Sequence, residues 1–462
     1  METTSDVVLT NWDGTWTYRP AVVVRPQTVE DIVEILKDEE RFPSPVRPAG
    51  SKHSTARMNG DDGGTIIDMK GMKKILDIGD DHVTAQAGAI YLDVSKKLRR
   101  QGKQFHITTE FGMLTFAAAA CAATKDASFP GEYGQINSYV TGVRLVEPDG
   151  TIREITEADD PEEMQLLRSS YGLTGIIFEV TMRVMPTTAI DVRHVSLSLD
   201  QFREKFPEFV QQNYSIMYYL FPHSDRIVVE LRKFNPSVEP STEWIWRWKN
   251  KFWRKYGPAT ALFLKRMTRN PSLRVALEKL HHFLIRRSMV WLIRSKKSVP
   301  HAQTIRYPEN PGPNKYIFSM WAFYEDGFFD ILQKYFEFCG DYYEKTGFRC
   351  DLPGVGYWIA KDRNALLSYS WDGPTLSIDP SSTGGKDWEE FLRAYNDFCS
   401  RHGGYPLPNQ TPFLTVEQVR KSYGDRLPKF AAYRKQRDPN NRLLDSQFAA
   451  YLDDVDTRME AA

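Results

Sequence analysis

A short apolar run that leads directly into a turn of small residues constrains this chain more than any other feature. Residues 46–54 read Val-Arg-Pro-Ala-Gly-Ser-Lys-His-Ser. Such a strand-to-turn segment leaves backbone N–H groups open to a phosphate, because few side chains obstruct the approach. Alone, the pattern is a weak signal, since a Gly/Ser turn is more often only a turn.

Further segments of small residues follow this turn and favour the phosphate-binding interpretation. Gly88-Ala89 follows an expected strand and begins a helix, and residues 115–124 read TFAAAACAAT. A second glycine loop covers residues 129–136, and residues 171–177 form another Gly-containing segment. Together they predict a body in which several backbone segments approach one diphosphate.

Residues 20 to about 185 alternate short β-rich runs with helices, which predicts an α+β nucleotide-binding body. Thr28 is expected to cap the first helix, with Asp31 completing a capping box. Other elements are expected along the whole chain. The expected strands are 21–24, 64–68, 82–86, 140–146, 175–184, 192–199, 214–220, 226–232 and 316–323, and the expected helices are 92–101, 328–346, 416–423 and 427–436.

Composition excludes several classes of protein. Hydrophobic residues at 41% and charged residues at 26% are ordinary for a globular protein, and 462 residues predict two or three domains. Four cysteines without C-x-x-C spacing predict neither a disulfide framework nor a metal site. The first residues show no signal peptide, and the uncharged run at 111–124 is too short to span a membrane, so we expect a cytoplasmic protein.

Several of these motifs resemble the vanillyl-alcohol-oxidase type, or PCMH-type, of FAD-dependent oxidoreductases. The likeness lies in Asn11-Trp12 ahead of Arg25-Pro26, in Arg-Pro-x-Gly-x-x-His-Ser at 47–54 and in Gly-Leu-Thr-Gly-Ile at 172–176. It also lies in Arg437-Asp438-Pro439 followed by Leu443-Leu444-Asp445. The nearest branches are the sugar-lactone and alditol oxidases and decaprenylphosphoryl-ribose oxidase.

The resemblance implies an α+β fold with three parts. Residues 1–188 would form a two-subdomain, PCMH-type FAD-binding domain. Residues 189–402 would form a mixed α/β substrate (cap) domain with an antiparallel sheet, carrying a basic aromatic helical insert at 243–297. Residues 403–462 would return to the flavin domain.

FAD is the cofactor that the resemblance implies. His53 stands where lactone and alditol oxidases link a histidine to the flavin 8α-methyl group, which predicts covalent FAD; the alternative is a non-covalent flavin beside His53. Cys121 is expected to be buried packing rather than a second link. The implied FAD-binding residues are Pro48, Ala49, Gly50, Ser51, Lys52, His53, Ser54, Gly88, Thr115, Ala118, Ala119, Thr124, Gly131, Tyr133, Gly134, Gly175 and Ile176.

The sequence departs from the family pattern at two places. Ala117-Ala118 replaces paired glycines, and Lys125-Asp126 follows Thr124 where lactone oxidases have His-Gly. These departures leave open a non-catalytic binding protein with a degenerate flavin site. Catalytic candidates from the facing strands and the terminal segment are Tyr357, Lys361, Tyr369 and Gln410.

The resemblance implies an enzyme that oxidises an alcohol carbon of a polyol, sugar lactone or lipid-linked sugar. A hydride would pass to flavin N5, and oxygen or an unknown acceptor would take the electrons. The alternative within the same fold is a reductase or desaturase of a C=C bond in an apolar lipid, such as a sterol or prenyl chain.

The zero net charge of the chain conceals a strongly basic segment. Residues 243–297 hold 15 Lys and Arg against two Glu, together with five of the eleven tryptophans. One interpretation is a solvated helix whose Leu273, Leu277, Leu280 and Leu284 face the core. The others are peripheral contact with an anionic membrane, or recognition of an anionic substrate. Nucleic acid is not expected, because no reading module is recognisable.

Overall fold

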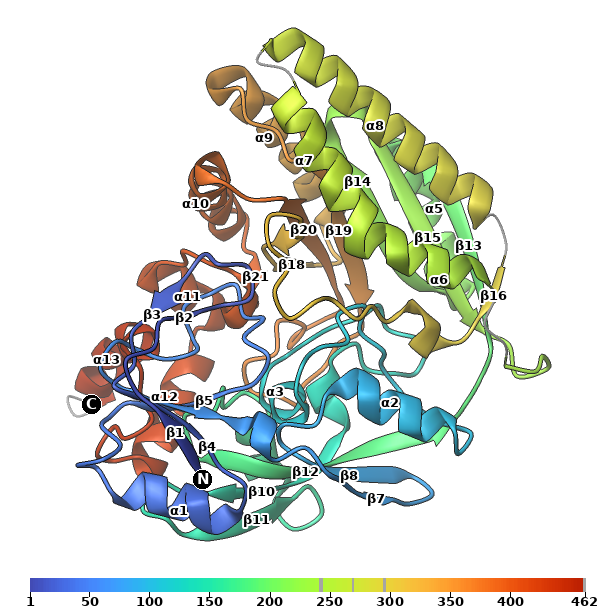
Figure 1. The fold of residues 1–462 in the computed structure, drawn as a ribbon. Coiled ribbons are helices and arrows are strands. Elements are labelled where there is room, and N and C mark those ends of the chain that lie inside the picture. Colours follow the sequence, from blue (N-terminus) through green and yellow to red (C-terminus); the bar gives the residue numbers. More distant parts are fainter. Residues whose placement is uncertain (241–243, 268–269, 294–295, 460–462) are drawn as a thin grey trace.

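A computed structural model of the chain describes residues 1–240, 244–267, 270–293 and 296–459. Its sheets fall into two parts, with the amino- and carboxy-terminal segments together at the bottom and left of Figure 1 and a large sheet above them. The sequence prediction of an α+β fold is confirmed.

The first sheet is formed by the amino-terminal quarter of the chain. Its strand order is β1(Glu2–Thr4), β4(Val22–Arg25), β6(Thr65–Asp68) and β5(Val46–Ala49), with β4, β6 and β5 parallel. Helix α1(Val29–Lys37) begins at Thr28 with the expected capping box to Asp31, and its Ile32 and Ile35 are buried against the sheet. A separate hairpin pairs β2(Leu9–Thr10) with β3(Thr17–Tyr18).

A second, antiparallel sheet lies beside the first. Its order is β11(Ile152–Thr156), β10(Val140–Val146), β12(Ile176–Pro186), β8(His82–Gln86) and β7(Ile75–Ile78), and β9(Lys103–Phe105) also pairs with β12. Helices α2(Tyr91–Arg99), α3(Phe116–Cys121) and α4(Pro161–Leu167) pack on it. Ile176 and Phe178 of β12 share a core with α1, so the two sheets form one body.

The upper part is built on a nine-stranded antiparallel sheet. Its order is β16(Lys296–Ser298), β13(Ile190–Leu197), β15(Arg226–Phe234), β14(Ser215–Phe221), β19(Leu352–Ile359), β20(Thr375–Ser382), β18(Trp321–Tyr324) and β21(Tyr405–Pro406), with β17(Ile317–Phe318) also on β20. Every residue of β14 is buried. A strand without a polar face must be covered on both sides, and this one is.

Helices cover the two faces of that sheet separately. Alternate residues of β14 pack either with α5(Leu199–Gln211), α9(Phe328–Thr346) and α10(Lys386–Arg401) or with the insert. The insert consists of α6(Trp244–Lys251), a π-helical turn, α7(Gly257–Met267) and α8(Pro271–Leu292), which lie along the upper right edge in Figure 1. Glu243, Arg269 and Arg294 of the predicted basic segment lie outside the described residues.

The leucine stripe of the insert faces away from the core. Leu273, Leu280 and Leu284 are 49%, 53% and 55% exposed, and Leu277 is half-buried. The prediction that this stripe faces the core is therefore wrong. The core of the insert is formed by Ile285 and Met289, which lie on the opposite side of α8.

The carboxy-terminal helices return to the lower part. They are α11(Val416–Tyr423), α12(Arg426–Arg437) and α13(Ser446–Met459). In the turn after α12, the Asp438 carboxylate accepts from the backbone N–H groups of Arg442 and Leu443. The Arg442 guanidinium then donates to the carbonyls of Ile35 and Leu36 at the end of α1. This turn therefore ties the terminal segment to the first sheet.

The expected strands and helices lie close to their predicted positions, with one difference. The expected strand at 316–323 is interrupted, giving β17 and β18, because both pair with β20 on either side of Pro380, which has no N–H to donate. All four cysteines are free. The three-part domain division stays a prediction, with β12 ending at Pro186 and β13 beginning at Ile190. None of the described helices is long and apolar enough to cross a membrane.

Candidate active site

The turn that follows β5 borders a cavity of the lower part, named here the cradle cavity. It lies between the 46–54 segment, the start of α3 and the 171–177 segment, and most of its lining is backbone or small side chains. Gly50 packs against Thr115 so closely that a Cβ at Gly50 would lie 2.3 Å from Thr115 Oγ1. The cavity therefore depends on glycine at this position.

The loop at 50–54 is held in an unusual backbone conformation. Lys52 has a φ of +57°, a region that residues other than glycine rarely adopt. The backbone N–H of Trp12 donates to the Lys52 carbonyl at 2.7 Å, and the Asn11 side-chain amide donates to the Ser54 carbonyl at 3.0 Å. The Asn-Trp pair near the start of the chain therefore fixes the loop.

A buried arginine connects this loop to the terminal segment. Arg47 forms an ion pair with Asp445 at 3.0 Å. Its guanidinium also donates to the carbonyls of Tyr171, Gly172 and Leu443. Three motifs that are far apart in the sequence thus meet at one side chain, which gives a structural reason for the Arg-Pro, Gly-Leu-Thr-Gly and Leu-Leu-Asp motifs.

His53 lies where the cradle cavity meets a second cavity. Its ring centroid is 4.3 Å from that of Phe111 and 5.0 Å from that of Trp12. Burial lowers the pKa of His53 to about 3, so the imidazole is neutral at physiological pH. Its Nδ1 is a buried atom without a hydrogen-bond partner among the described residues.

Other buried polar atoms of the cradle cavity also lack protein partners in the described chain. They are Asn59 Nδ2, Asn409 Oδ1 and Gln410 Oε1. Buried donors and acceptors are normally satisfied, so a bound polar molecule is expected here. The glycine-dependent cradle, the neutral His53 and these unsatisfied atoms together fit a flavin dinucleotide.

Most of the residues predicted to bind FAD line the cradle cavity. They are Pro48, Ala49, Gly50, Ser51, Lys52, His53, Ser54, Thr115, Ala118, Thr124 and Gly175. Ala117 and Cys121 line it too, so the methyl groups of Ala117-Ala118 do not close it. Residues that the sequence reasoning did not assign include Arg47, Asn59, Tyr171 and Asn409.

The other predicted FAD contacts lie away from this cavity. Ala119 and Ile176 are fully buried in hydrophobic cores, and Gly134 packs on Ser128 and Ile359. Gly131 and Tyr133 are exposed in a surface turn. Gly88 supports close backbone packing, since a Cβ there would lie 2.0 Å from the Met69 carbonyl oxygen. In the structure these six residues have packing or turn roles.

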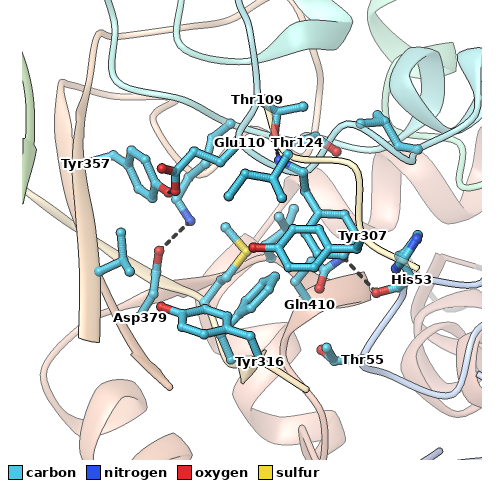
Figure 2. Close-up of a pocket in the computed structure, with 18 of the residues that line it drawn as sticks. His53, Thr55, Thr109, Glu110, Thr124, Tyr307, Tyr316, Tyr357, Asp379 and Gln410 are labelled. Carbon is cyan, nitrogen blue, oxygen red and sulfur yellow. Dashed lines mark hydrogen bonds and ion pairs between the residues drawn. The ribbon is translucent and has the colours of Figure 1, made fainter. Parts of the chain in front are cut away.

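The second cavity lies between the lower part and the nine-stranded sheet, and is named here the substrate cavity. It has a volume of about 130 Å³ and meets the cradle cavity at His53, Leu114, Thr124 and Gln410. Figure 2 shows Tyr307, Tyr316 and Tyr357 around it, with Glu110 and Asp379 on one side and His53 and Gln410 on the other. The Gln410 amide donates to the His53 carbonyl at 3.3 Å.

Lys125 and Asp379 form a buried ion pair in the wall of the substrate cavity. Lys125 Nζ lies 3.0 Å from Asp379 Oδ2, and 5.2 Å from the centroid of the Tyr357 ring. Burial raises the pKa of Asp379 to about 6, although Lys125 opposes the shift. The lysine of the unusual Thr-Lys-Asp sequence thus reaches the cap sheet.

A larger charged cluster lies behind this wall. Arg232 contacts Asp126 at 2.9 Å and Glu230 at 2.7 Å, and Glu230 also contacts His194 at 2.6 Å and Lys249 at 3.0 Å. Although burial alone would raise the pKa of Glu230, Lys249 and Arg232 hold it well below its usual range. Glu230 is therefore ionised, and its charge is already paired.

Glu110 is the carboxylate of this region that is least neutralised. It lines the substrate cavity, 4.0 Å from Lys249 Nζ and 3.4 Å from the Tyr357 hydroxyl. Burial raises the pKa of Glu110 to about 7, with Lys249 opposing and Glu230 assisting the shift. Burial also raises the pKa of Tyr357 well above its usual value, so its hydroxyl stays a hydrogen-bond donor.

The four predicted catalytic candidates divide into two pairs. Tyr357 and Gln410 line the substrate cavity. Tyr369 is buried elsewhere and donates to the Ala123 carbonyl, and Lys361 is exposed in the loop after β19. The structure therefore does not bring Tyr369 or Lys361 to the cavity. The sequence reasoning missed Glu110 and Asp379, and it named Lys125 only as a departure from the family pattern.

The arrangement defines an FAD-dependent oxidoreductase, and comparison with known proteins agrees. Residues 20–156 match the FAD binding domain family, and residues 180–454 match the D-arabinono-1,4-lactone oxidase family. The second match covers more than half of the chain. The chain belongs to the D-arabinono-1,4-lactone oxidase family and is an enzyme.

Individual relatives extend the likeness over most of the chain. L-gulono-1,4-lactone dehydrogenase of Mycobacterium tuberculosis is 22% identical over 440 residues, which cover 95% of this chain and 97% of the relative. D-arabinono-1,4-lactone oxidase of Candida glabrata is 23% identical over 56% of this chain and 49% of its own. Cholesterol oxidase from B. sterolicum shares the fold, with a TM-score of 0.77, 14% identity and 96% coverage of both chains.

Proposed function

We propose that this enzyme oxidises a secondary hydroxyl of a sugar 1,4-lactone. The observation that carries the proposal is the meeting of the cradle and substrate cavities at His53, Thr124 and Gln410. A small alcohol in the substrate cavity would lie against the flavin edge. When bound, FAD would supply the acceptor for a hydride from the carbon of such an alcohol. The printed names of the relatives, which are lactone oxidases and dehydrogenases, support the same substrate class.

The lining of the substrate cavity suits a sugar lactone. Tyr219, Tyr307 and Tyr316 line the cavity together with Glu110, Lys125 and Gln410, so aromatic surface and hydrogen-bonding side chains are both present. A compact ring with several hydroxyls matches this combination.

Glu110 is the residue that we expect to take the proton of the substrate hydroxyl. A general base works best when its pKa is close to the working pH, and the pKa of Glu110 is raised to about 7. The Tyr357 hydroxyl, 3.4 Å away, orients the carboxylate, and Lys249 stabilises its charged form. Departure of the proton to Glu110 makes hydride loss from the carbon favourable.

Lys125 and Gln410 are expected to position the substrate. Burial lowers the pKa of Lys125 and the Asp379 carboxylate opposes that shift, while Lys125 lies in the cavity wall. Gln410 has a buried Oε1 without a protein partner in the described structure, and a substrate or flavin N–H or O–H would satisfy it. Both side chains would hold polar groups of the substrate, while Glu110 acts on one hydroxyl.

The covalent link through His53 is part of this proposal. A neutral imidazole is the form that can bond to the 8α carbon, and burial keeps His53 neutral. Acid precipitation of the wild-type protein should leave the flavin in the yellow pellet, whereas His53→Ala should release it to the supernatant. Release of all flavin from the wild type would leave only non-covalent binding. The cytoplasmic location and the electron acceptor, oxygen or another oxidant, stay predictions.

Anaerobic titration of the purified holoenzyme tests the proposed substrate class. D-arabinono-1,4-lactone and L-gulono-1,4-lactone should bleach the flavin absorbance, and cholesterol should not. Dithionite serves as the control that the flavin can be reduced. A flavin that dithionite bleaches but neither lactone does would rule out these substrates, and bleaching by cholesterol would favour a lipid alcohol.

A further inference from the structure

The outer side of the insert exposes far more apolar surface than the rest of the chain. Ten of the fifteen large hydrophobic side chains that are exposed in the described chain belong to residues 244–291. Trp291 is 80% exposed, Trp244 64% and Phe263 62%. Monomeric proteins rarely expose large contiguous apolar patches unless the patch binds something.

The exposed residues of α8 are arranged on one face. Leu273, Leu280, Leu284 and Trp291 follow one another at intervals of seven, four and seven residues, with Phe283 beside them. These spacings place side chains on the same side of a helix. The opposite side, with Ile285 and Met289, packs on the cap sheet. Helix α8 therefore has two apolar sides, one buried and one exposed.

Helix α7 lies beside α8 and extends this outer face. The two helices contact each other, and both run along the upper edge of the molecule in Figure 1. Phe263 and Met267 of α7 are 62% and 47% exposed, and Trp248 of α6 is 44% exposed. The outer sides of α6, α7 and α8 are named here the insert surface.

Every exposed charged side chain in the described part of the insert is positive, and of these Arg247, Lys251 and Arg254 line a cavity shared with α2 rather than the insert surface. Within the described residues 244–267 and 270–292, the exposed charged side chains are Arg247, Lys251, Arg254, Lys255, Arg266, Lys279 and Arg287. The acidic residue of this stretch, Glu278, is buried and lies within 4 Å of Arg274 and Arg349. In its described part, the surface thus combines exposed tryptophan and leucine with positive charge.

A basic cavity continues this surface inward beside Phe283. It has a volume of about 290 Å³, and Lys279, Arg286 and Arg349 line it together with His223 and His282. Arg349 Nε lies 3.8 Å from Glu278 Oε2, so the charge of Arg349 is already paired. Burial lowers the pKa of His223 to about 3 and that of His282 to about 4, so both rings are neutral. Lys279 and Arg286 are the cations of this lining that could meet an anionic group such as a phosphate.

We propose that the insert surface binds the surface of an anionic phospholipid bilayer. The exposed tryptophan, phenylalanine and leucine side chains would enter the boundary between headgroups and acyl chains, and the lysines and arginines would contact lipid phosphates. The cavity beside Phe283 would receive a headgroup. Charge complementarity selects this occupant over a second copy of the chain, because two copies would bring like charges together.

The inner side of the insert contributes residues to the substrate cavity. Trp253 and Lys249 come from the same insert and reach the substrate cavity and its charged cluster. The bilayer and the substrate would therefore meet opposite sides of one helical layer. The proposal concerns binding to lipid and does not depend on which substrate the enzyme oxidises.

Co-sedimentation with vesicles tests the proposal directly. The purified holoenzyme should bind vesicles of phosphatidylcholine with 30% phosphatidylserine and bind pure phosphatidylcholine vesicles at least tenfold more weakly. Binding should weaken as salt is raised, and Trp fluorescence should shift to the blue on binding. Equal binding to the two kinds of vesicle, or no binding, would overturn the proposal.

Two variants and a control separate the contributions of the surface. F263S/L284S/W291S removes exposed apolar groups, and K279E/R287E reverses two charges. Each should lower the affinity for anionic vesicles at least tenfold. For the charge variant this follows because one basic residue contributes roughly fivefold. L76S/I152S removes two comparably exposed side chains, 45% and 46% exposed, from the lower part and should bind as the wild type does. Equal loss in this control would overturn the assignment to the insert.

Analytical ultracentrifugation without lipid tests whether a second copy of the chain binds the insert surface instead. The wild type should sediment as the F263S/L284S/W291S variant does. A wild-type dimer that this variant converts to a monomer would identify the surface as an interface between copies and overturn the membrane proposal. The flavin absorbance spectrum of each variant checks that it is folded.

Discussion

The two cavities that meet at His53 are built in opposite ways. The cradle cavity is lined mainly by glycine, alanine, serine and other small residues, and Arg47, which also lines it, connects the loops. The substrate cavity is lined by large aromatic side chains and by Glu110, Lys125 and Asp379, gathered from both parts of the molecule. The first fits the FAD dinucleotide, and we propose that the second moves a proton.

This difference assigns separate roles to the two cavities. Small neutral residues let a large cofactor approach the backbone closely, but they offer no group that changes its protonation near neutral pH. The charged cluster around Glu110 costs desolvation energy, and its ion pairs offset that cost only while they are complete. Changes in the cradle should therefore affect flavin content, and changes in the cluster should affect rate or stability with flavin still bound.

The largest effect is expected at Glu110. Glu110→Gln removes the proton acceptor while keeping the shape of the side chain, so flavin reduction by the lactone should slow by ~10²–10⁴-fold. Anaerobic stopped-flow absorbance measures this rate, and the spectrum before mixing shows whether flavin content is unchanged. Glu154→Gln, at a surface residue of β11, is the matched control. A rate within twofold of the wild type would remove Glu110 from the mechanism.

The next effect concerns the buried cluster behind the substrate cavity. Arg232→Met leaves Asp126 and Glu230 without their shared partner, which should lower the free energy of unfolding by about 3–5 kcal/mol. Arg144→Met breaks an ion pair with Glu179 whose arginine is 44% exposed, and should cost less than about 1 kcal/mol. Urea denaturation followed by fluorescence measures both. Equal costs would mean that the buried cluster contributes no more than a surface pair.

A smaller effect is expected in the cradle. Gly50→Ala places a Cβ against Thr115, and overpacking of this kind costs ~1–3 kcal/mol, equivalent to roughly 5- to 150-fold weaker FAD binding. Thr115→Ala in the same chain should restore part of the loss, because it removes the two nearest atoms. Gly142→Ala, where a Cβ would meet only ordinary contacts at 3.7 Å, is the control. The flavin-to-protein absorbance ratio reports the outcome.

The smallest effect is expected at Lys361, which the sequence suggested as a catalytic candidate. Its side chain is exposed beyond the end of β19, so Lys361→Ala should change the rate of flavin reduction less than about twofold. The same stopped-flow assay measures it. A loss comparable with that of Glu110→Gln would show that the loop after β19 reaches the substrate during turnover.

The sequence allowed the cradle to be predicted because its parts are local motifs. A glycine turn after a strand, a run of alanines and a Gly-Leu-Thr-Gly segment each indicate a close approach of the backbone, and Pro48 to Ser54 line the cradle cavity. Gly131 and Tyr133 lie outside it, because a glycine in an exposed turn has the same local signature as one in a binding loop.

The substrate cavity could not be predicted in this way, because its chemistry arises from contacts between distant residues. Lys125 meets Asp379 across 254 positions, and Glu110 meets Tyr357 across 247. Sequence spacing does not indicate contacts between residues so far apart in the chain. The basic insert was visible in composition, but whether its leucines faced the core or the solvent depended on which side of α8 packs on the sheet.

The pH dependence of flavin reduction tests the central claim most directly. Glu110 must be deprotonated to accept the hydroxyl proton, and its pKa is raised to about 7. With saturating lactone in anaerobic stopped-flow, the rate for the wild type should rise with pH to a plateau, with its midpoint near 7. Glu110→Gln should remain slow, without that midpoint. A midpoint that persists unchanged in Glu110→Gln would contradict the account.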